Sequence, residues 1–258
     1  MWGAVIGDIV GSRHEFAHPA KTKDFEFWRD DCHVTDDSVL TAAVADVLIN
    51  DRPVAETLQA WCRDHFGVRY SYGTMFSFWI FQDSPGPYGS FGNGAGMRVS
   101  PAAFLNRNSL EAALAASDKV TEVTHDHPEG MKGARATTHA IWMAFAGEEP
   151  TEIRKAVAET YDYDLSRSVD EIRPGYEYDE TCRRTVPEAI TCALESSSLE
   201  DAIRNAVSLG GDADTLAAIA GAVAEGLHGM PEEMIGKAKS YLDDAPRIRE
   251  VMEKMYGS

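Results

Sequence analysis

Two short acidic motifs, far apart in the chain, carry residue types suited to binding a divalent cation. The first is Thr35-Asp36-Asp37-Ser38, where two adjacent carboxylates stand between two hydroxyl groups. Adjacent carboxylates repel each other, and a helix N-terminus offsets only part of that cost. Mg²⁺ and Mn²⁺ prefer carboxylate and hydroxyl oxygens, so a bound ion would stabilise the cluster. The alternative is a solvated helix cap, because Thr, Asp and Ser are common in first turns.

The second motif is Gly210-Gly211-Asp212-Ala213-Asp214-Thr215. Asp212 and Asp214 can present oxygens to a common centre, and the glycine pair allows close backbone approach. The following segment, Thr215–Leu227, consists mostly of Ala, Ile, Val, Leu and Gly, which predicts a buried central helix. Carboxylates at the end of a buried helix are costly unless they are paired or metal-bound. We therefore favour a metal site here over a simple cap.

Together the two motifs offer nearly enough ligands for a two-metal site. Two ions about 3.5–4 Å apart would share a bridging carboxylate and hold a water of lowered pKa. Zinc is not expected, because none of the eight histidines forms an HExxH pair. The four cysteines contain no CxxC pair either. Oxygen-only ligation points to two Mg²⁺ or Mn²⁺ ions.

Three further segments could contribute polar groups to such a site. The stretch from Gly7 to Glu15 predicts an amphipathic first helix with glycines for close packing, and Glu15 could equally reach the metal pair. Between Ser90 and Arg98, alternate glycines would let several backbone N–H groups converge on an anion. The alternative there is a structural turn. In the third segment, His125 and His127 could each cap a helix or face a ligand.

Helical periodicity dominates the segments that must position these residues, so the chain is predicted to be all-α. Alternating strand patterns are scarce, and residues 176–178 form at best a short ribbon. Residues 83–96 and 125–130 are expected to be loops. The predicted helices are Ser38–Leu48, Val54–Phe66, Ser109–Val123, Met131–Ala146, Thr151–Tyr161, Val186–Leu194, Leu199–Val207, Thr215–Leu227, Glu232–Tyr241 and Ala245–Met255.

Composition narrows the class of protein further. The chain has 258 residues, 44% of them hydrophobic, which is typical of a globular protein. No linker or repeat divides it, so a single domain over residues 1–258 is expected. A formal net charge of −18 argues against a nucleic-acid or anionic-membrane surface. The start of the sequence lacks the pattern of a secretory signal, and the four cysteines are scattered along the chain. Together these two features predict a cytoplasmic location.

Five segments, in their order along the chain, resemble the ADP-ribosylglycohydrolase family. They are GAVIGDIVGSRHE, TDDS, GSFGNGAGMRVSP, THDHPEGMKGA and SLGGDADTLAAIAGAVAEGLHG. The pairing of TDDS with a late GGDADT is the most specific part of this resemblance, which extends over nearly the whole chain. It implies a compact, single-domain orthogonal helix bundle with a dinuclear Mg²⁺ or Mn²⁺ cleft. It also implies a hydrolase that cleaves the bond between an acceptor and C1 of the distal ribose of ADP-ribose.

The resemblance also assigns roles by matching position. It implies that Thr35, Asp36, Asp37 and Asp214 hold one metal, and that Asp212, Asp214 and Thr215 hold the other. Glu15 matches a mobile glutamate that can ligate a metal. The pyrophosphate is implied to lie beside Gly89, Ser90, Gly92 and Asn93. Phe91 is implied to lie near adenine, and His125 to face the ADP-ribose.

Hydrolysis of a ribosyl bond passes through an oxocarbenium-like state. We expect the metals to orient the ribose hydroxyls and a water, with Glu15, Asp36 or Asp212 accepting the water proton. ADP-ribosyl-arginine on a protein is the expected substrate. Serine, O-acetyl and nucleobase linkages stay open, as does a non-catalytic ADP-ribose-binding relative. Specificity is expected in the segments 15–31 and 83–89, and a monomer is preferred. A prenyl or terpene synthase is disfavoured, because the DDxxD spacing is absent.

Overall fold

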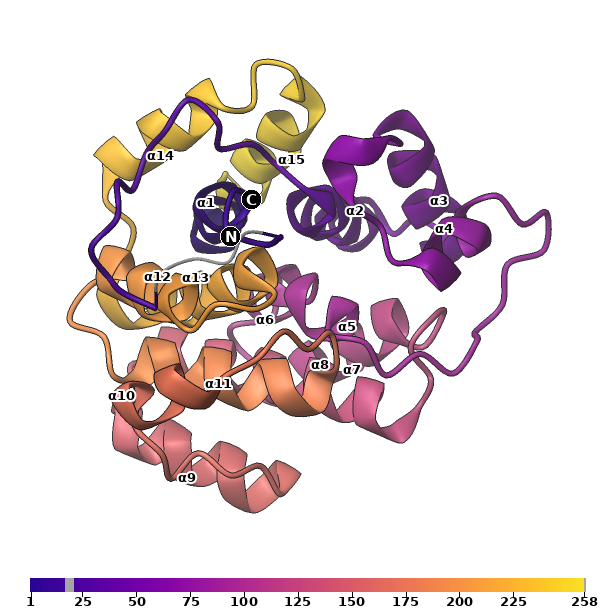
Figure 1. Cartoon of the computed structure of the whole chain (residues 1–258). Coiled ribbons are helices and arrows are strands. Elements are labelled where there is room, and N and C mark those ends of the chain that lie inside the picture. Colours follow the sequence, from indigo (N-terminus) through magenta and orange to yellow (C-terminus); the bar gives the residue numbers. More distant parts are fainter. Residues whose placement is uncertain (17–20, 258) are drawn as a thin grey trace.

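The computed structural model describes residues 1–16 and 21–257 and is all-α, as the periodicity predicted. Within those residues no strand is present, and residues 176–178 form no ribbon; one isolated antiparallel bridge joins Gly92 to Thr181. In Figure 1, α1 and α2 appear nearly end-on, whereas α8 and α11 run across the view, so the helices pack at steep angles.

The α-helices, in chain order, are α1 (Trp2–Gly11), α2 (Asp36–Asn50), α3 (Val54–Asp64), α4 (Thr74–Ile80), α5 (Gly94–Met97), α6 (Ser100–Leu105), α7 (Leu110–Thr121), α8 (Pro128–Phe145), α9 (Pro150–Tyr161), α10 (Val169–Ile172), α11 (Cys182–Leu194), α12 (Leu199–Ser208), α13 (Ala213–His228), α14 (Glu232–Ser240) and α15 (Pro246–Tyr256). Short 3₁₀ turns, η1 (Val68–Tyr70) and η2 (Arg173–Gly175), complete the set.

The centre of the fold is the pair α1 and α13, whose backbones touch. Gly3, Gly7 and Gly11 recur every four residues and so share one face of α1. A Cβ atom on Gly7 would lie 2.0 Å from the carbonyl oxygen of Ala217, and one on Gly11 would lie 2.4 Å from the Cα atom of Asp214. The close packing predicted for Gly7 and Gly11 is confirmed. The prediction of an amphipathic helix is wrong, because every residue of α1 is buried.

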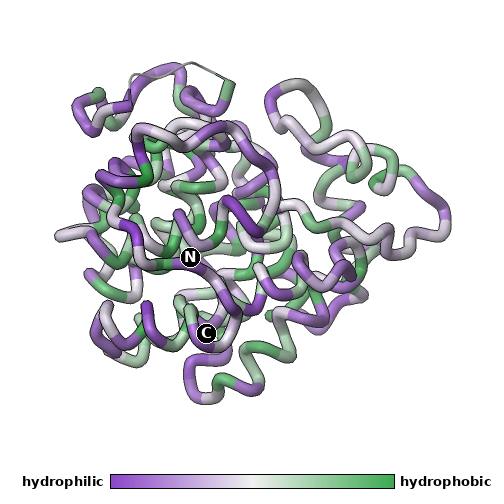
Figure 2. The backbone as a smooth tube through the Cα atoms, turned by 60° about the horizontal axis from the view of Figure 1, so that its bottom comes forward, coloured by the Kyte–Doolittle hydropathy of each residue, from purple (hydrophilic) through white to green (hydrophobic). Residues whose placement is uncertain are grey.

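The buried hydrophobic residues form one core, and the two termini lie near each other (Figure 2). The backbone N–H of Trp2 donates to the hydroxyl of Tyr256 at 3.1 Å, and that hydroxyl also hydrogen-bonds Glu225 of α13. The N-terminal end of α1 is therefore held by the C-terminal third of the chain. No helix in the described residues has the length and apolar character that a membrane-spanning segment needs.

Several short helices escaped the sequence analysis. Helices α4, α5, α6 and α10 have seven residues or fewer, too short for a 3.6-residue period to stand out. The loop predicted over residues 83–96 ends earlier, because α5 begins at Gly94. Helix α8 begins at Pro128 instead of Met131, so the loop predicted over residues 125–130 is also shorter.

Candidate active site

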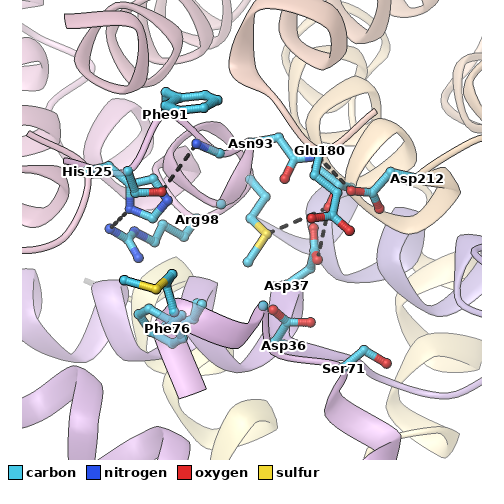
Figure 3. A pocket seen from close by; sticks show the side chains of 18 of the residues that line it. Asp36, Asp37, Ser71, Phe76, Phe91, Asn93, Arg98, His125, Glu180 and Asp212 are labelled. Atoms are coloured by element: carbon cyan, nitrogen blue, oxygen red, sulfur yellow. Dashed lines mark hydrogen bonds between the residues drawn. The ribbon is translucent and has the colours of Figure 1, made fainter. Parts of the chain in front are cut away.

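A cavity of about 500 Å³ opens where α2, α5 and α13 converge, within the size range of small-molecule sites. Figure 3 shows Asp36, Asp37 and Asp212 at one end of it and Arg98 and His125 at the other. Its walls come from seven regions of the chain. They include Glu15, Asp36, Asp37, Leu40, Ser71, Gly73, Thr74, Met75, Phe76, Tyr88, Gly89, Ser90, Phe91, Gly92, Asn93, Gly94, Met97, Arg98, His125, Tyr178, Glu180, Asp212, Asp214 and Thr215.

The start of α2 is fixed by Asp8, a buried carboxylate on α1. Asp8 accepts hydrogen bonds from the backbone N–H of Thr35 at 3.1 Å and from its hydroxyl at 2.6 Å. It also accepts from the N–H of Ser38 at 3.1 Å and from the hydroxyl of Ser38. Thr35 caps the helix, accepting at Oγ1 from the N–H of Asp37. Asp8 therefore sets where Asp36 and Asp37 stand, and the sequence analysis assigned it no role.

The start of α13 depends on the two preceding glycines. Gly210 and Gly211 have φ values of +71° and +84°, which side-chain-bearing residues rarely adopt. A Cβ atom on Gly211 would also lie 2.9 Å from a ring carbon of Tyr176. This turn places Asp212 at the N-cap and Asp214 in the first turn of α13.

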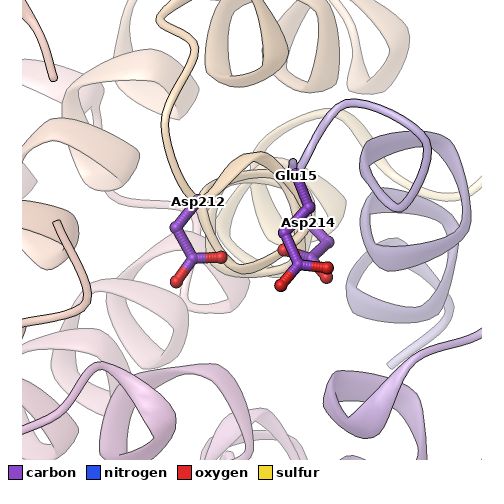
Figure 4. A group of neighbouring side chains, drawn as sticks. All are labelled: Glu15, Asp212 and Asp214. Carbon is purple, nitrogen blue, oxygen red and sulfur yellow. The ribbon is translucent and has the colours of Figure 1, made fainter. Parts of the chain in front are cut away.

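The two acidic motifs meet, as their proposed shared function requires. The hydroxyl of Thr35 lies 3.2 Å from Oδ2 of Asp214, and the hydroxyl of Thr215 donates to Oδ2 of Asp37 at 3.3 Å. Glu15 joins them: carboxylate oxygens of Glu15, Asp212 and Asp214 all lie within 4.8 Å of one another (Figure 4). Thr35 is fully buried behind the cavity wall, whereas Asp36 is half-buried and lines it.

The carboxyl groups of this cluster hold their protons more tightly than usual. Burial, then the negative charge of Asp212, raises the pKa of Glu15 to about 8. Burial is also the first cause that raises the pKa of Asp36, Asp37 and Asp214 well above the ordinary value. Among the described residues, no lysine or arginine forms an ion pair with any of them. A positive charge placed among these carboxyl groups would lower their pKa values again, and no side chain of the cluster supplies one.

These residues fit a hard divalent ion. Every ligand atom on offer is an oxygen, from carboxylates or from the hydroxyls of Thr35 and Thr215. In addition, Oδ1 of Asp37 is buried and has no hydrogen-bond partner among the described residues. A buried carboxylate oxygen without a donor is costly, and a metal ion would satisfy it.

The glycine-rich loop forms the opposite wall, and most of its backbone donors are already used. The N–H of Gly89 donates to Asp126 at 2.7 Å, and the N–H of Ser90 donates to the carbonyl of Thr124 at 3.3 Å. The N–H of Gly92 donates to Oγ of Ser90, and that of Asn93 to the carbonyl of Glu180. Fewer N–H groups therefore face the cavity than the glycine spacing suggested.

Asn93 joins the loop to the acidic end. Its Nδ2 donates to Oδ2 of Asp212 at 2.6 Å and to the hydroxyl of Thr185 at 3.1 Å. The side chain is only 6% exposed, so this amide is committed to positioning Asp212. Phe91, by contrast, is half exposed at the rim, with its ring centroid 5.3 Å from that of His127.

The two candidate histidines have separate roles in the structure. Nδ1 of His127 accepts from the N–H of Glu129 at 3.1 Å, so His127 caps α8. His125 lines the cavity and is 5% exposed. Burial, then the positive charge of Arg98, holds the pKa of His125 well below its usual range, so the ring is neutral at physiological pH.

The segments expected to set specificity reach the cavity only at their ends. Of residues 15–31, Glu15 lines it, and residues 17–20 lie outside the described part of the chain. Beyond them the segment is tied down: Nζ of Lys21 donates to the carbonyl of Arg173 at 2.9 Å, and Arg204 donates to the carbonyls of Lys23 and Phe25. Of residues 83–89, Tyr88 and Gly89 line the cavity.

Several lining residues were not found from the sequence. Ser71, Gly73 and the first residues of α4, Thr74 to Phe76, lie in none of the motifs singled out from the sequence, and neither do Tyr178 and Glu180. Arg98 ends the glycine-rich motif, but the sequence analysis assigned it no role. Its place beside an apolar segment is the one sequence feature that could have drawn attention to it. An arginine there is either exposed or buried with a polar partner or ligand.

Comparisons with known proteins agree with this geometry. A family model described as ADP-ribosylglycohydrolase matches residues 1–257. A relative from Pseudomonas putida (strain GB-1), ADP-ribosylarginine hydrolase Tri1, is 26% identical over all of this chain and 80% of its own length. A protein of the same name from Serratia proteamaculans (strain 568) is 28% identical over 64% of this chain and 46% of its own length.

A solved structure titled ADP-ribosylglycohydrolase-related protein complex has the same fold. It superposes with a TM-score of 0.67 and 21% identity, covering 93% of this chain and 94% of that one. The likeness extends over the whole bundle, so the helices that build the cavity belong to one shared architecture.

Proposed function

The chain belongs to the ADP-ribosylglycohydrolase family and is a glycosyl-bond hydrolase, and from that premise we propose that it removes ADP-ribose from arginine side chains of proteins. The bond cleaved is that between the guanidinium and C1 of the distal ribose. The names of the Pseudomonas and Serratia relatives support arginine as the acceptor.

The proposal rests on one observation: the two ends of the cavity differ in charge. Buried carboxylates from α2 and α13 meet at one end, and the glycine-rich loop, His125 and Arg98 line the other (Figure 3). A ribose with several hydroxyls suits a metal-binding acidic end, and a pyrophosphate suits an end that carries donors and a positive charge. ADP-ribose has both parts in one molecule.

We propose two Mg²⁺ or Mn²⁺ ions at the acidic end. Thr35, Asp36, Asp37 and Asp214 would hold one ion, and Asp212, Asp214 and Thr215 would hold the other. Bound ions would supply Lewis acidity that orients the ribose hydroxyls and lowers the pKa of a water.

The remaining chemistry falls to side chains of this chain. Glu15, Asp36 or Asp212 accepts the proton of the attacking water, and each lines the cavity at the acidic end. Asn93 holds the Asp212 carboxylate in place through its 2.6 Å hydrogen bond. As the C1–N bond breaks, the same carboxylates stabilise the positive charge that develops on the ribosyl ring, and the arginine departs as a neutral guanidine.

The test is a release assay over several linkages. The protein is incubated with ADP-ribose linked to an arginine peptide, a serine peptide or an O-acetyl group, with Mg²⁺ or with a chelator. We expect release from the arginine linkage, abolished by the chelator and restored by added Mg²⁺. Binding of ADP-ribosyl-arginine peptide without release would contradict hydrolysis and indicate an ADP-ribose-binding protein. Preferential release from serine would contradict the acceptor.

A further inference from the structure

Arg98 is a buried cation with no negative partner in the described part of the chain. Its side chain is fully buried just after α5, and it takes part in none of the ion pairs formed by the described residues. Its Nε and Nη1 atoms have no hydrogen-bond partner there either. Burial lowers the pKa of Arg98 to about 10, so the guanidinium still carries its charge at neutral pH. An uncompensated buried charge needs an explanation beyond packing.

The remaining nitrogen of Arg98 is fully engaged, and its partners are informative. Nη2 donates to the hydroxyl of Thr124 at 2.6 Å, to the carbonyl of Val120 at 3.4 Å, and faces Nδ1 of His125 at 3.2 Å. The hydroxyl of Thr124 lies 2.7 Å from the same Nδ1. Since that hydroxyl accepts from Arg98, its own proton is free to point at His125.

Two groups therefore approach Nδ1 of His125. A guanidinium can only donate, so a proton on Nδ1 would point at the N–H groups of Arg98 3.2 Å away, whereas a bare Nδ1 accepts from one of them and shares it with the carbonyl of Val120 at 3.4 Å. The contact favours the bare, accepting form of Nδ1. A neutral imidazole with a bare Nδ1 carries its proton on Nε2. The low pKa of His125, caused by burial and by Arg98, agrees with a ring that stays neutral.

The position of Nε2 shows where this proton can be used. A Cβ atom on Gly94 would lie 3.3 Å from Nε2, and one on Gly92 would lie 3.7 Å from it, so the glycine-rich loop leaves space beside the nitrogen. Among the described residues, Nε2 has no hydrogen-bond partner, and His125 lines the cavity. The N–H group is thus a donor that faces the cavity opposite the carboxylates.

We propose that Arg98 and Thr124 are positioning residues that lock His125 in the Nε2–H tautomer, so that His125 presents one fixed donor to a phosphate or ribose oxygen of the ligand. The buried charge of Arg98 strengthens that donor by polarising the ring, and it is the counter-charge that an anionic ligand finds at this end of the cavity. This proposal rests on the proposed function for the identity of the ligand, but not for the state of the ring.

The first experiment measures the tautomer directly. In protein labelled with ¹⁵N at histidine, the His125 ring signals are assigned by their loss in His125→Gln, without metal or substrate. We expect a neutral ring protonated at Nε2. A ring protonated at Nδ1, or a charged ring at pH 7, would overturn the proposal.

The second experiment separates the Thr124 hydroxyl from the shape of its side chain. Thr124→Val keeps the shape and removes the donor, and Thr124→Ser keeps the donor. One lost hydrogen bond predicts an ADP-ribose Kd that rises about 2- to 10-fold in Thr124→Val and returns toward the original value in Thr124→Ser. The Val variant should also show a mixture of ring tautomers, which a purely structural role would not produce.

Thr121→Val is the matched control, because Thr121 is a fully buried threonine on the neighbouring α7 whose hydroxyl has no partner among the described residues. It should change neither the tautomer nor the Kd.

Arg98→Met removes the charge and should weaken binding of both ADP-ribose and inorganic pyrophosphate by more than Thr124→Val does. Circular dichroism establishes that each variant is folded. If Thr124→Val keeps both the original tautomer and the original Kd, Thr124 does not position His125.

The two proposals fail in different ways. A protein with the Nε2–H tautomer and weakened ADP-ribose binding in Thr124→Val, but with no release from any linkage, would refute the hydrolase and leave the positioning role intact. Release from arginine together with an Nδ1–H ring would do the reverse.

Discussion

Within residues 1–16 and 21–257, the carboxyl groups of α2, α13 and Glu15 meet at one end of the cavity with no basic side chain paired to them. At the other end, and over the same residues, the guanidinium of Arg98 is buried with no carboxylate paired to it. Both ends carry unsatisfied polar atoms among the described residues: Oδ1 of Asp37 at the first, Nε and Nη1 of Arg98 at the second. A direct ion pair would give each of these charges a partner. Here the cavity separates them.

This separation indicates which kind of ion or ligand each end of the cavity binds. The acidic end lacks a cation, and its ligand atoms are oxygens that divalent ions prefer. The basic end holds its own charge and donor, so it needs an anion and no metal. We therefore expect the acidic end to respond strongly to metal and pH, and the basic end to respond weakly to both.

Substituting Asp214 should have the largest effect, because Asp214 belongs to the second acidic motif and contacts Thr35 of the first. Asp214→Asn removes the shared carboxylate, so turnover should fall by roughly a thousandfold or more, and Mg²⁺ binding should be lost in calorimetry. Asp46→Asn is the matched control, because Asp46 is a buried carboxylate of α2 that hydrogen-bonds Trp61 outside the cavity. Unchanged Mg²⁺ binding in Asp214→Asn would break the contrast between the two ends.

A methyl group at Gly11 should disturb the acidic end without removing a ligand. Its Cβ would lie 2.4 Å from the Cα of Asp214, so α1 and α13 must move apart. Overpacking of this kind typically costs about 1–3 kcal/mol. We expect Gly11→Ala to unfold at a lower denaturant concentration and to bind Mg²⁺ at least about tenfold more weakly.

The control for Gly11→Ala is Gly236→Ala on α14, where an added Cβ would meet nothing within 4 Å. That change should leave Mg²⁺ binding unaltered and raise helix stability slightly. If Gly11→Ala binds Mg²⁺ like the control, the α1–α13 contact does not position the ligands.

The response to pH should also belong to the acidic end. The free carboxyl of Glu15 has its pKa raised to about 8, so near pH 7 a bound metal must displace its proton. Between the unfolded and the folded pKa of Glu15, the folded, metal-free protein binds more protons than the unfolded chain. The contribution of Glu15 to the free energy of unfolding is therefore fully present below the unfolded pKa and is lost as pH rises through about 8.

Thermal unfolding with and without Mg²⁺ measures this. The increase in Tm caused by Mg²⁺ should be larger at pH 8.5 than at pH 6. Glu15→Gln should reduce the difference between the two pH values, since one displaced proton is removed. An equal increase in Tm at both pH values would show that the carboxyl protons are not linked to metal binding.

The smallest effect is expected at the basic end. A Cβ on Gly94 would approach Nε2 of His125 to 3.3 Å, which crowds the proposed donor without closing the cavity. Gly94→Ala should weaken ADP-ribose binding by about 1 kcal/mol, or roughly fivefold in Kd. Mg²⁺ affinity, measured on the same protein, should not change. A loss of Mg²⁺ binding in this variant would mean that the two ends are not separate.

The acidic end was largely predictable from the sequence, whereas the basic end was not. Asp36, Asp37, Asp212 and Asp214 stand in adjacent or alternate positions, and such clusters are costly without a cation, so their chemistry shows in the sequence itself. Their convergence needed only that both motifs begin buried helices. Arg98, by contrast, acts through Thr124 and His125, which follow it by 26 and 27 residues and lie beside it only in the folded chain.

Asp8 escaped for a related reason. Its four donors all belong to Thr35 and Ser38, so its position is set by the crossing of α1 and α2 and not by any local motif. The regular helices were predictable because their apolar period repeats over two and a half turns or more. Helix α4, whose first residues line the cavity, has seven residues of nearly uniform apolar character and therefore no period to read.

The most direct test of the account is to locate Mn²⁺ in crystals by anomalous scattering. We expect Mn²⁺ in the cavity, in contact with Asp36 or Asp37 from α2 and also with Asp212 or Asp214 from α13. Mn²⁺ bound by one motif alone, or crystals in which Asp36 and Asp214 lie far apart, would contradict it.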